Sequence, residues 1–406
     1  IMLVKNNQLF NKKKILIIVQ NLPVPFDRRV WMEATSLQKE GFVVSVICPK
    51  KYDYNNSDEV LENVNIFRYP LLLEANTSPL AFLFEFISCF IFTSLLSLKV
   101  LYKIGFKVIH ICNPPETYFS LAFLYKLFGK KIIFDHHDLS PEMYLAKQHN
   151  AKKSSFYYRL LLWMEKMTFK VSDIIITTNQ SHKLVAVERG KINSKNIFIV
   201  RSGPDIDRFK GFKYIESLKQ KKPYLICYLG EMCKQDGVGL FLTELNNFNS
   251  PFIKENVQIT FIGKGPEQPN LVKQSMQLGL ESYVNFTGRI SDLDLANYLY
   301  SADLCFDTSP YNSWTDRSTM NKIIEYMAFS NPVVAFNLFE TKYSANQAGL
   351  YADNGNYEDF FKKIEYLLEN KKVREKMAAV GTTRFNNELS WTFSKKYLIE
   401  AYSMVL

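Results

Sequence analysis

The feature that most constrains the fold of this chain is a repeated alternation of short β-branched runs with longer helical stretches. The first cycle begins with a strand expected over Lys14–Gln20 and continues with a helix over Arg28–Lys39. Asp27 is placed to cap that helix, and Gly41 takes the position after its end, before a second strand over Phe42–Cys48. This alternation predicts a parallel sheet with helices on both faces.

The alternation stops and restarts once, which predicts two domains of this kind. In the first half, further strands are expected at Val64–Tyr69, Lys107–Cys112, Lys131–Asp135, Asp173–Thr178 and Asn196–Val200. After a basic stretch, the second half has strands expected at Tyr224–Leu229, Val257–Ile262, Tyr283–Phe286, Leu304–Asp307 and Pro332–Phe336. The length of 406 residues exceeds the ~150 typical of one domain. We therefore expect an α/β protein with two doubly wound, Rossmann-like domains, residues 1–204 and 205–390, that face a cleft.

Composition narrows the class of protein and its partners. Apolar residues make up 47% and charged residues 22% of the chain, which excludes an intrinsically disordered protein. A net charge of +10 favours anionic partners, such as nucleotide phosphates, anionic lipid or nucleic acid. Dispersed lysines are also typical of an ordinary solvated surface. Six cysteines without a Cys-x-x-Cys spacing indicate neither a disulfide framework nor a zinc site, so a reducing compartment fits best.

One apolar segment bears on localisation. Leu, Phe and Ile dominate residues 79–98, which are enough to span a bilayer. Glu85 lies inside this segment, Ser and Thr interrupt it, and the strands expected on both sides need it as a crossover helix. Because its apolar residues nearly encircle the helix, we expect either burial between elements or partial immersion in a membrane face. The polar, basic stretch Asn6–Lys14 predicts no signal peptide.

Loops that follow the strands are where ligands bind in such sheets. The loop after the first strand brings Arg28 and Arg29 to the start of a helix. Guanidinium groups and free helix amides there suit a diphosphate or another anion. Pairing of these arginines with carboxylates such as Glu33, one turn further on, is the structural alternative.

Two of the five histidines follow another strand, in Phe134-Asp135-His136-His137-Asp138. A histidine flanked by carboxylates keeps one tautomer and can bind a sugar hydroxyl or move a proton. A metal site is the competing hypothesis, but the other Cys and His residues show no matching ligand spacing. We therefore expect no metal.

In the second half, the strongest site pattern follows the strand that ends at Asp307. A helix start is expected there, where Ser318, Thr319 and the first-turn amides would cradle a phosphate. Glu325, two turns later on one face, would accept hydrogen bonds from paired ribose hydroxyls. An ordinary amphipathic helix with a solvated glutamate is the alternative. Gly263 begins a turn that lacks the third glycine of a dinucleotide fingerprint and predicts only a closely packed strand–helix turn.

These motifs carry a resemblance to a known family. In chain order they are Asp27-Arg28-Arg29-Val30-Trp31, Asn113-Pro114-Pro115-Glu116, His136-His137-Asp138-Leu139, Arg201-Ser202-Gly203-Pro204-Asp205, Gln235-Asp236-Gly237-Val238, Phe286-Thr287-Gly288-Arg289 and Glu325-Tyr326-Met327-Ala328. Together they resemble the retaining, nucleotide-sugar-dependent GT-B glycosyltransferases (group 1, family 4) of the bacterial surface-polysaccharide branch. The resemblance implies a donor nucleotide on the second domain and an acceptor toward the first. It also implies no essential metal and a last helix, 391–406, that crosses back to the first domain.

Two departures from the family pattern concern the donor. The family often has two Glu separated by seven residues, whereas Arg317 stands eight positions before Glu325, so the neighbouring Asp316 is expected to contact the sugar. The family also often has Arg and Lys in the first loop of the second domain, where this chain has Glu231 and Asp236. The charge for the diphosphate must then come from other cations, namely Arg201, Lys234, Arg289 or Lys322.

The resemblance implies transfer of a sugar from a UDP-linked donor to a hydroxyl of a glycan or a polyprenyl-diphosphate-linked acceptor, with retention at the anomeric carbon. The expected catalytic residues are His137, Asp316 and Glu325, and the expected donor-binding residues are Arg201, Lys234, Gly263, Arg289, Ser318, Thr319, Lys322 and Glu325. No cofactor besides the donor and no nucleic acid partner is expected. We expect a cytoplasmic protein attached peripherally to the inner face of the cytoplasmic membrane, with Lys99, Lys103 and Lys107 near anionic headgroups. A catalytically silent nucleotide- or glycan-binding module and a nucleotide-sugar epimerase are the alternatives.

Overall fold

The computed structural model describes residues 13–73, 79–148 and 151–406. The chain divides into two compact units: unit 1 comprises Ile1–Val200 and Lys395–Leu406, and unit 2 comprises Arg201–Ser394. The chain therefore passes from unit 1 to unit 2 after Val200, four residues before the boundary expected at 204, and returns at Lys395. Most of the segment that bears on a signal peptide, residues 6–12, lies outside the described residues.

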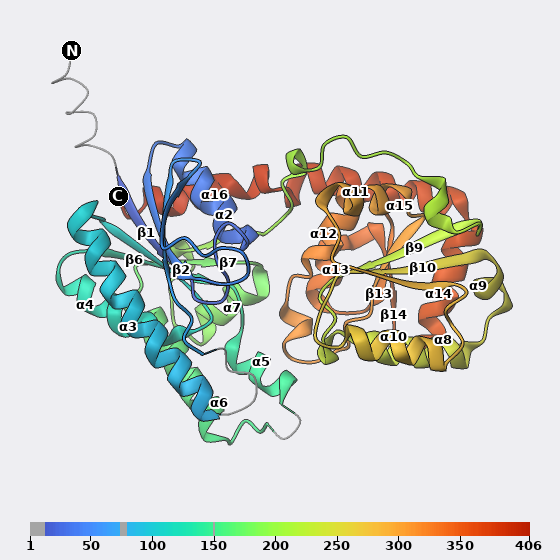
Figure 1. Ribbon diagram of the computed structural model, residues 1–406, viewed down its shortest axis with the longest axis horizontal. Coiled ribbons are helices and arrows are strands. Elements are labelled where there is room, and N and C mark those ends of the chain that lie inside the picture. Colours follow the sequence, from blue (N-terminus) through green and yellow to red (C-terminus); the bar gives the residue numbers. More distant parts are fainter. Residues whose placement is uncertain (1–12, 74–78, 149–150) are drawn as a thin grey trace, which may run out of the picture. The chain divides into compact units, whose positions relative to one another are not determined.

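Unit 1 is built on an eight-stranded sheet of order β3-β4-β2-β1-β5-β6-β7-β8 (Figure 1). Every pairing is parallel except that of β3 with β4. The strands are β1 (Lys14–Ile18), β2 (Val43–Pro49), β3 (Asp58–Leu61), β4 (Val64–Tyr69), β5 (Val108–Cys112), β6 (Lys131–His136), β7 (Ile174–Thr177) and β8 (Ile197–Ile199).

The helices of unit 1 cover both faces of this sheet. They are α2 (Arg28–Lys39), α3 (Pro79–Lys103), α4 (Phe119–Leu127), α5 (Ser140–Lys147), α6 (Phe156–Val171), α7 (Gln180–Glu188) and, from Lys395 onward, α16 (Trp391–Ser403). The expected ends of α2 are confirmed, because Asp27 Oδ1 accepts from the Val30 N–H (3.1 Å) and Gly41 has a φ of +87°. Right-handed crossovers place α2 on one face and α3, α4 and α6 on the other, and Figure 1 shows α3 and α4 on the side away from α2 and α16.

Unit 2 is built on a six-stranded, all-parallel sheet of order β11-β10-β9-β12-β13-β14. Its strands are β9 (Tyr224–Leu229), β10 (Val257–Ile262), β11 (Val284–Gly288), β12 (Leu304–Asp307), β13 (Val333–Phe336) and β14 (Gly349–Ala352). Its helices are α8 (Val238–Phe248), α9 (Pro251–Asn256), α10 (Gln268–Gln277), α11 (Asp292–Ser301), α12 (Asn321–Ala328), α13 (Phe339–Ala345), α14 (Tyr357–Glu369) and α15 (Lys371–Arg384). One face buries an aromatic core that includes Phe241, Phe261 and Phe306, and the other buries Leu299, Ile323 and Tyr326.

The two sheets confirm the expected doubly wound α/β architecture. Each expected strand is present, and its ends differ from the expectation by at most two residues. Two short edge strands, β3 and β14, escaped the sequence analysis. The sequence of β3 is Asp-Glu-Val-Leu, whose side chains alternate between exposed and half-buried positions, so it has no apolar run to indicate a buried strand.

Candidate active site

The sheet of unit 2 has a switch point between β9 and β12. The chain winds outward from β9 to β11 on one side and from β12 to β14 on the other, and ligands bind at such points in open α/β sheets. Tyr326 of α12 links the two strands here. Its hydroxyl accepts from the Leu229 N–H (2.8 Å) and donates to the Phe306 carbonyl (3.0 Å). The position of α12 at the switch point is therefore fixed by hydrogen bonds as well as by packing.

Lys322, in the first turn of α12, places a positive charge at this switch point. Its Nζ donates to Asp307 Oδ1 (3.0 Å) and to the Tyr228 hydroxyl (3.1 Å). Burial alone would lower the pKa of Lys322, but the nearby Asp307 carboxylate outweighs burial and raises the pKa above its ordinary value. A Cβ on Gly230, the first residue after β9, would lie only 3.1 Å from Nζ. The charged ammonium therefore lies directly against the loop that follows β9.

Glycines allow the loops after β9, β10 and β11 to touch through their backbones. Gly263 has a φ of +128°, and a Cβ there would lie 2.0 Å from the Gly230 carbonyl oxygen. A Cβ on Gly265 would lie 2.4 Å from the Met232 carbonyl oxygen. The Gly263 N–H also donates to the Gly288 carbonyl (3.0 Å). The expected closely packed turn is thus present, while a contact of Gly263 with the donor stays a prediction.

The segment before α12 corrects one expectation. Ser318 and Thr319 lie between a 3-10 turn (Thr315–Arg317) and α12, whose first residue is Asn321. Ser318 has an extended backbone (ψ 134°), and its hydroxyl donates to the Trp314 carbonyl (2.7 Å). A helix start at Ser318 and Thr319 is therefore wrong, because Ser318 closes the preceding turn instead. The role of both residues toward phosphate stays a prediction.

The two carboxylates expected to contact the donor have partners within unit 2. Asp316 Oδ1 accepts from the Phe339 N–H (2.8 Å), which joins the 3-10 turn to the start of α13. Glu325 lies in the second turn of α12, where its Oε1 accepts from Arg208 Nη2 (3.0 Å) and 15% of its side chain is exposed. Glu325 is thus a partly buried member of an ion pair and not the solvated glutamate of the alternative.

The remaining expected cations differ in burial. Arg201 is buried, with its guanidinium over the Tyr343 ring (4.9 Å) and Nη1 3.9 Å from Glu340 Oε2, and burial lowers its pKa. Lys234 and Arg289 are exposed, in the loops after β9 and β11. Their contact with phosphate stays a prediction.

Asp236 stands where the family often has a basic residue, and it supports its own loop. Its Oδ2 accepts from the Cys233 N–H (3.0 Å), and its backbone carbonyl accepts from the Thr308 hydroxyl (2.6 Å). These bonds join the loop after β9 to the loop after β12. The carboxylate therefore has a structural role where a phosphate-binding cation is common.

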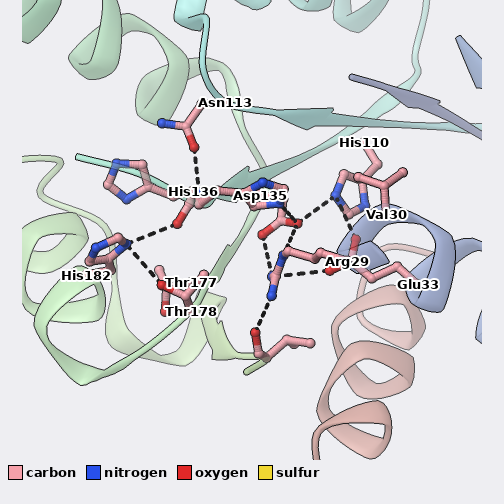
Figure 2. Close-up of polar contacts among 12 residues, drawn as sticks. Arg29, Val30, Glu33, His110, Asn113, Asp135, His136, Thr177, Thr178 and His182 are labelled. Atoms are coloured by element: carbon pink, nitrogen blue, oxygen red, sulfur yellow. Dashed lines mark hydrogen bonds and ion pairs between the residues drawn. The ribbon is translucent and has the colours of Figure 1, made fainter. Parts of the chain in front are cut away.

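A buried polar cluster lies in unit 1, where β5, β6 and α2 meet (Figure 2). Arg29 donates through Nε and Nη2 to the two oxygens of Asp135 (3.0 and 2.7 Å). Its Nη2 lies 3.2 Å from Glu33 Oε1, and its Nη1 donates to the Val200 carbonyl (2.7 Å). Of the two roles considered for Arg29, pairing with carboxylates is the one observed, whereas Arg28 is exposed.

Burial and neighbouring charges act in opposite directions on the groups of this cluster. Burial would raise the pKa of Asp135, but Arg29 and His137 outweigh burial and hold it well below its usual range. Burial raises the pKa of Glu33 well above its usual range, and it lowers the pKa of His110. With one guanidinium near two carboxyl groups, the environment favours the ionised form of Asp135 and the protonated form of Glu33. The cluster is thus centred on the ion pair between Arg29 and Asp135.

The two adjacent histidines have opposite environments, because successive residues of a strand face opposite sides of the sheet. His136, the last residue of β6, is fully buried against Phe169, and burial lowers its pKa to about 3. His137 follows the strand, and 16% of its side chain is exposed. Its Nε2 lies 2.5 Å from Asp135 Oδ2, and its backbone N–H donates to Asn113 Oδ1. Of the two, His137 is the one that a substrate can reach.

Two sets of side chains in this cluster could hold a metal ion by distance. Asp135 groups with His110 and Cys112, and also with Glu33 and His137, with ligand atoms within 4.8 Å of one another. Both Asp135 oxygens already accept hydrogen bonds from Arg29, and the guanidinium charge repels a cation at the same place. The donor set therefore suits hydrogen bonding better than metal binding.

Sequence reasoning missed several of the residues that build these sites, among them His110, Tyr402, Tyr228, Arg208 and Asp307 as a lysine partner. His110 had a signal, since it is a lone polar residue in the apolar strand Val-Ile-His-Ile-Cys. Tyr402 had none, because its contact with His110 joins residues 292 positions apart.

Two family models match the chain. The model described as "Glycosyltransferase Family 4" matches residues 27–208, and the model described as "Glycosyl transferases group 1" matches residues 223–370. The two-sheet fold is that of GT-B proteins, and both models describe glycosyltransferases. The chain belongs to the glycosyltransferases of group 1, family 4, and is an enzyme of that family.

Individual relatives are distant. The chitobiosyldiphosphodolichol β-mannosyltransferase of Debaryomyces hansenii is 23% identical over 82% of this chain and 74% of its own length. Among solved structures, sucrose-phosphate synthase from Thermosynechococcus elongatus superposes with a TM-score of 0.78 at 16% identity, covering 97% of this chain and 99% of that one. An Anabaena protein in complex with UDP superposes with a TM-score of 0.66 at 14% identity, covering 96% and 100%. At these identities the structures show a shared fold.

Proposed function

We propose that this glycosyltransferase moves a hexosyl group from a UDP-sugar to a hydroxyl of a glycan or lipid-linked oligosaccharide, with retention of configuration. The observation that carries the donor part is the charged Lys322 against the Gly230 loop at the switch point of unit 2. A fixed ammonium and the first turn of α12 together suit a diphosphate. The UDP bound to the Anabaena protein of the same fold supports the choice of nucleotide.

The chemistry requires stabilisation of a leaving diphosphate. The acceptor oxygen bonds to the anomeric carbon as the bond from that carbon to the diphosphate oxygen breaks, and the acceptor proton passes to the departing phosphate oxygen. Lys322 and the α12 amides stabilise the charge that develops on UDP. In this proposal Glu325 binds the ribose, whereas Asp316 and His137 contact the transferred sugar.

A panel of nucleotide sugars tests the donor part. The protein is incubated with UDP-, GDP- and dTDP-linked hexoses, and slow hydrolysis and a rise in Tm are measured. We expect a UDP-sugar to give both signals, because a ligand that binds only the native state stabilises it. Stabilisation without turnover, even with glycan acceptors, would indicate a silent binding module, and conversion to an epimeric donor would indicate an epimerase.

Stereochemistry needs its own measurement. The Debaryomyces relative is named for a β-mannosyl product, so the anomeric configuration of the product separates retention from inversion. We expect the product to keep the configuration of the donor. An inverted product would overturn retention and leave glycosyl transfer intact.

We also propose a lipid-linked acceptor at the inner face of the cytoplasmic membrane, in the synthesis of a bacterial surface polysaccharide. The name of the Debaryomyces relative specifies an acceptor linked to dolichol diphosphate. A lipid-linked acceptor requires its enzyme to meet the bilayer, and unit 1 carries a surface suited to that contact.

Helix α3 is apolar on its outer side and partly polar on its inner side. Half-exposed apolar side chains recur at helical spacing, namely Phe84, Ile87, Ile91, Leu95 and Leu98. The buried side includes Thr93, which bonds to the Tyr118 hydroxyl (3.1 Å), and Ser97, which bonds to the Tyr125 hydroxyl (2.8 Å). This polarity is the reverse of that of a helix on a water-exposed surface.

Length and composition agree with a bilayer contact. Ala81–Lys103 is long and apolar enough to cross a membrane, yet only 22% of its apolar window is buried within the protein. The inner side of this segment thus packs in the core of unit 1, with Cys89 and Val100 buried, while its outer side is exposed. The same face of the sheet adds exposed apolar side chains from α4 and α6, namely Phe123, Leu124, Leu127, Phe156, Tyr157 and Trp163.

The lysines contribute less than expected. Lys99 Nζ lies 2.6 Å from Asp58 Oδ2, so its charge is already paired, while Lys103 and Lys107 are exposed. Full burial of a leucine or isoleucine side chain contributes about 1.5–3 kcal/mol, against about 1 kcal/mol for each lysine near an anionic surface. We therefore propose that apolar insertion of α3 dominates attachment.

Vesicle co-sedimentation tests this attachment. We expect binding to phosphatidylglycerol vesicles that persists in part at about 1 M salt, where the screening length is only ~3 Å. The double substitution Ile91→Glu with Leu95→Glu should reduce binding at least tenfold, because two charges would enter the apolar layer. Leu240→Glu with Leu293→Glu is the matched control, since these leucines of unit 2 are similarly exposed. Equal binding by both variants, or no binding by the unaltered protein, would exclude α3 as the membrane contact.

A further inference from the structure

We propose that Tyr402 is a positioning residue for His137, acting through His110 and Asp135. The proposal rests on the proposed role of His137 in transfer. Tyr402 lies in α16, which joins unit 1 only after the chain has passed through unit 2. It would make the geometry of a substrate-contacting histidine depend on the docking of the last helix.

The contacts form a continuous buried path. The Tyr402 hydroxyl lies 2.7 Å from His110 Nδ1. His110 Nε2 lies 3.4 Å from Asp135 Oδ2, and the same oxygen lies 2.5 Å from His137 Nε2. Tyr402, His110 and Asp135 are each fully buried, whereas His137 reaches the surface. The path therefore leads from a buried side chain of α16 to His137, which is solvent-accessible.

The direction of the hydrogen bond between Tyr402 and His110 follows from the groups around the His110 ring. His110 is neutral, because burial lowers its pKa, so only one of its ring nitrogens carries a proton. Its Nε2 faces Asp135 Oδ2 at 3.4 Å and Glu33 Oε2 at 3.6 Å, and a bare lone pair facing the Asp135 carboxylate would be unfavourable. The proton is therefore on Nε2, and Nδ1 accepts from the Tyr402 hydroxyl. Burial raises the pKa of Tyr402 well above its usual range, so the phenol stays protonated and donates.

Asp135 transmits this constraint to His137. As an ionised acceptor it holds the proton of His137 on Nε2, which leaves Nδ1 to accept a hydrogen bond from a substrate hydroxyl. The other groups near Asp135 include Cys112 of β5. They also include Arg29 and Glu33 from α2, which are fixed in the same cluster (Figure 2). Without the Tyr402 hydroxyl, the His110 ring loses the hydrogen bond that fixes its position, and Asp135 Oδ2, 3.4 Å from His110 Nε2, loses a fixed neighbour.

A second contact supports the same coupling. Arg29, which holds both Asp135 oxygens, also donates to the carbonyl of Val200, the last residue before the chain enters unit 2. Both chain segments that connect the units therefore end in this cluster. The positions of these two chain segments and the position of His137 therefore all depend on the Asp135 carboxylate.

The variant Tyr402→Phe tests the proposal, because it removes one hydroxyl and keeps the ring that packs on Phe42. Two readouts are measured: steady-state kinetics, and 15N shifts of labelled histidine side chains, of which the chain has five. We expect kcat to fall about tenfold with the donor KM within twofold of the original. We also expect the His110 Nδ1 signal to shift, because that nitrogen loses its hydrogen bond, and the His137 ring signals to shift with it.

Tyr125→Phe is the matched control, since it removes another buried hydroxyl of unit 1, bonded to Ser97 at 2.8 Å. It should lower Tm about as much as Tyr402→Phe and leave kcat and the His137 signals unchanged. Unchanged His137 signals in Tyr402→Phe would overturn the proposal, whatever happens to kcat. Shifted signals with an unchanged kcat would uphold the link and overturn the role of His137 in transfer, which is a separate failure of the proposed function.

Discussion

Replacing Glu325 with alanine is expected to reduce kcat/KM for transfer at least 100-fold and to weaken binding of UDP, while the protein stays folded. In the proposed site, each hydrogen bond from a ribose hydroxyl to this carboxylate contributes about 1.5–3 kcal/mol, as hydrogen bonds to charged groups do. Two such bonds account for a loss of this size. Alanine is the best helix former, so α12 should persist. Isothermal titration with UDP and a coupled assay of donor consumption measure the two effects.

The control variants distinguish a role of Glu325 in nucleotide binding from a purely structural role in its ion pair with Arg208. Glu325 also pairs with Arg208 (3.0 Å), and Glu388, whose side chain is more exposed, pairs with Arg384 (2.6 Å) on α15. Glu388→Ala should leave both UDP affinity and kcat/KM unchanged. Glu325→Gln keeps the side-chain volume and removes only the charge, so it should retain the Tm and lose most of the affinity. A Glu325→Ala variant with unaltered UDP affinity would show that the carboxylate serves only Arg208.

Much of the fold could be predicted because the central strands can be recognised from their local composition. A strand buried on both faces of a parallel sheet is a continuous β-branched run, and Val257–Ile262 and Leu304–Asp307 were predicted with their observed ends. Edge strands have no such run. β3 carries two acidic residues, and β14 begins at Gly349, so local composition could not reveal them.

The sites were harder to predict, because their residues are brought together by the sheet and not by the sequence. The motif around His137 was evident in the sequence, but the choice between two adjacent histidines depends on which face of the sheet each one meets. The role of Arg29 likewise depends on Asp135, 106 residues away. The start of α12 was misplaced because Ser318 bonds within the preceding turn, and Ser has similar propensities for turns and for helix caps.

The environment of helix α3 also could not be predicted from composition alone. Its composition is compatible with a core helix, a surface helix or a membrane helix, and only the positions of its polar residues decide among them. Thr93 and Ser97 face the sheet, where tyrosine hydroxyls bind them. The polar residues Thr93 and Ser97, which counted against a membrane span in the sequence, are among those that turn the apolar side outward.

His137→Ala is expected to lower kcat about 100- to 1000-fold while the affinity for UDP stays within twofold. The nucleotide is proposed to bind to unit 2, so a residue of unit 1 that contacts the transferred sugar contributes to the reaction and not to nucleotide binding. His137 is partly exposed, with one ring nitrogen held by Asp135, so its loss should change Tm little. Single-turnover kinetics with saturating donor and titration with UDP separate the two quantities.

His136→Ala is the control for this assignment. It should lower the stability of the protein, whereas His137→Ala should lower kcat. His136 is fully buried between Phe134 and Phe169 and next to His182. Its truncation should leave a cavity and lower the free energy of unfolding by about 2–4 kcal/mol, since buried side chains in packed cores are costly to remove. At a temperature where both variants are folded, His136→Ala should retain most of its kcat. If His136→Ala lost kcat at full stability while His137→Ala did not, the reactive histidine would be the one that the sheet buries, and the proposed site would be wrong.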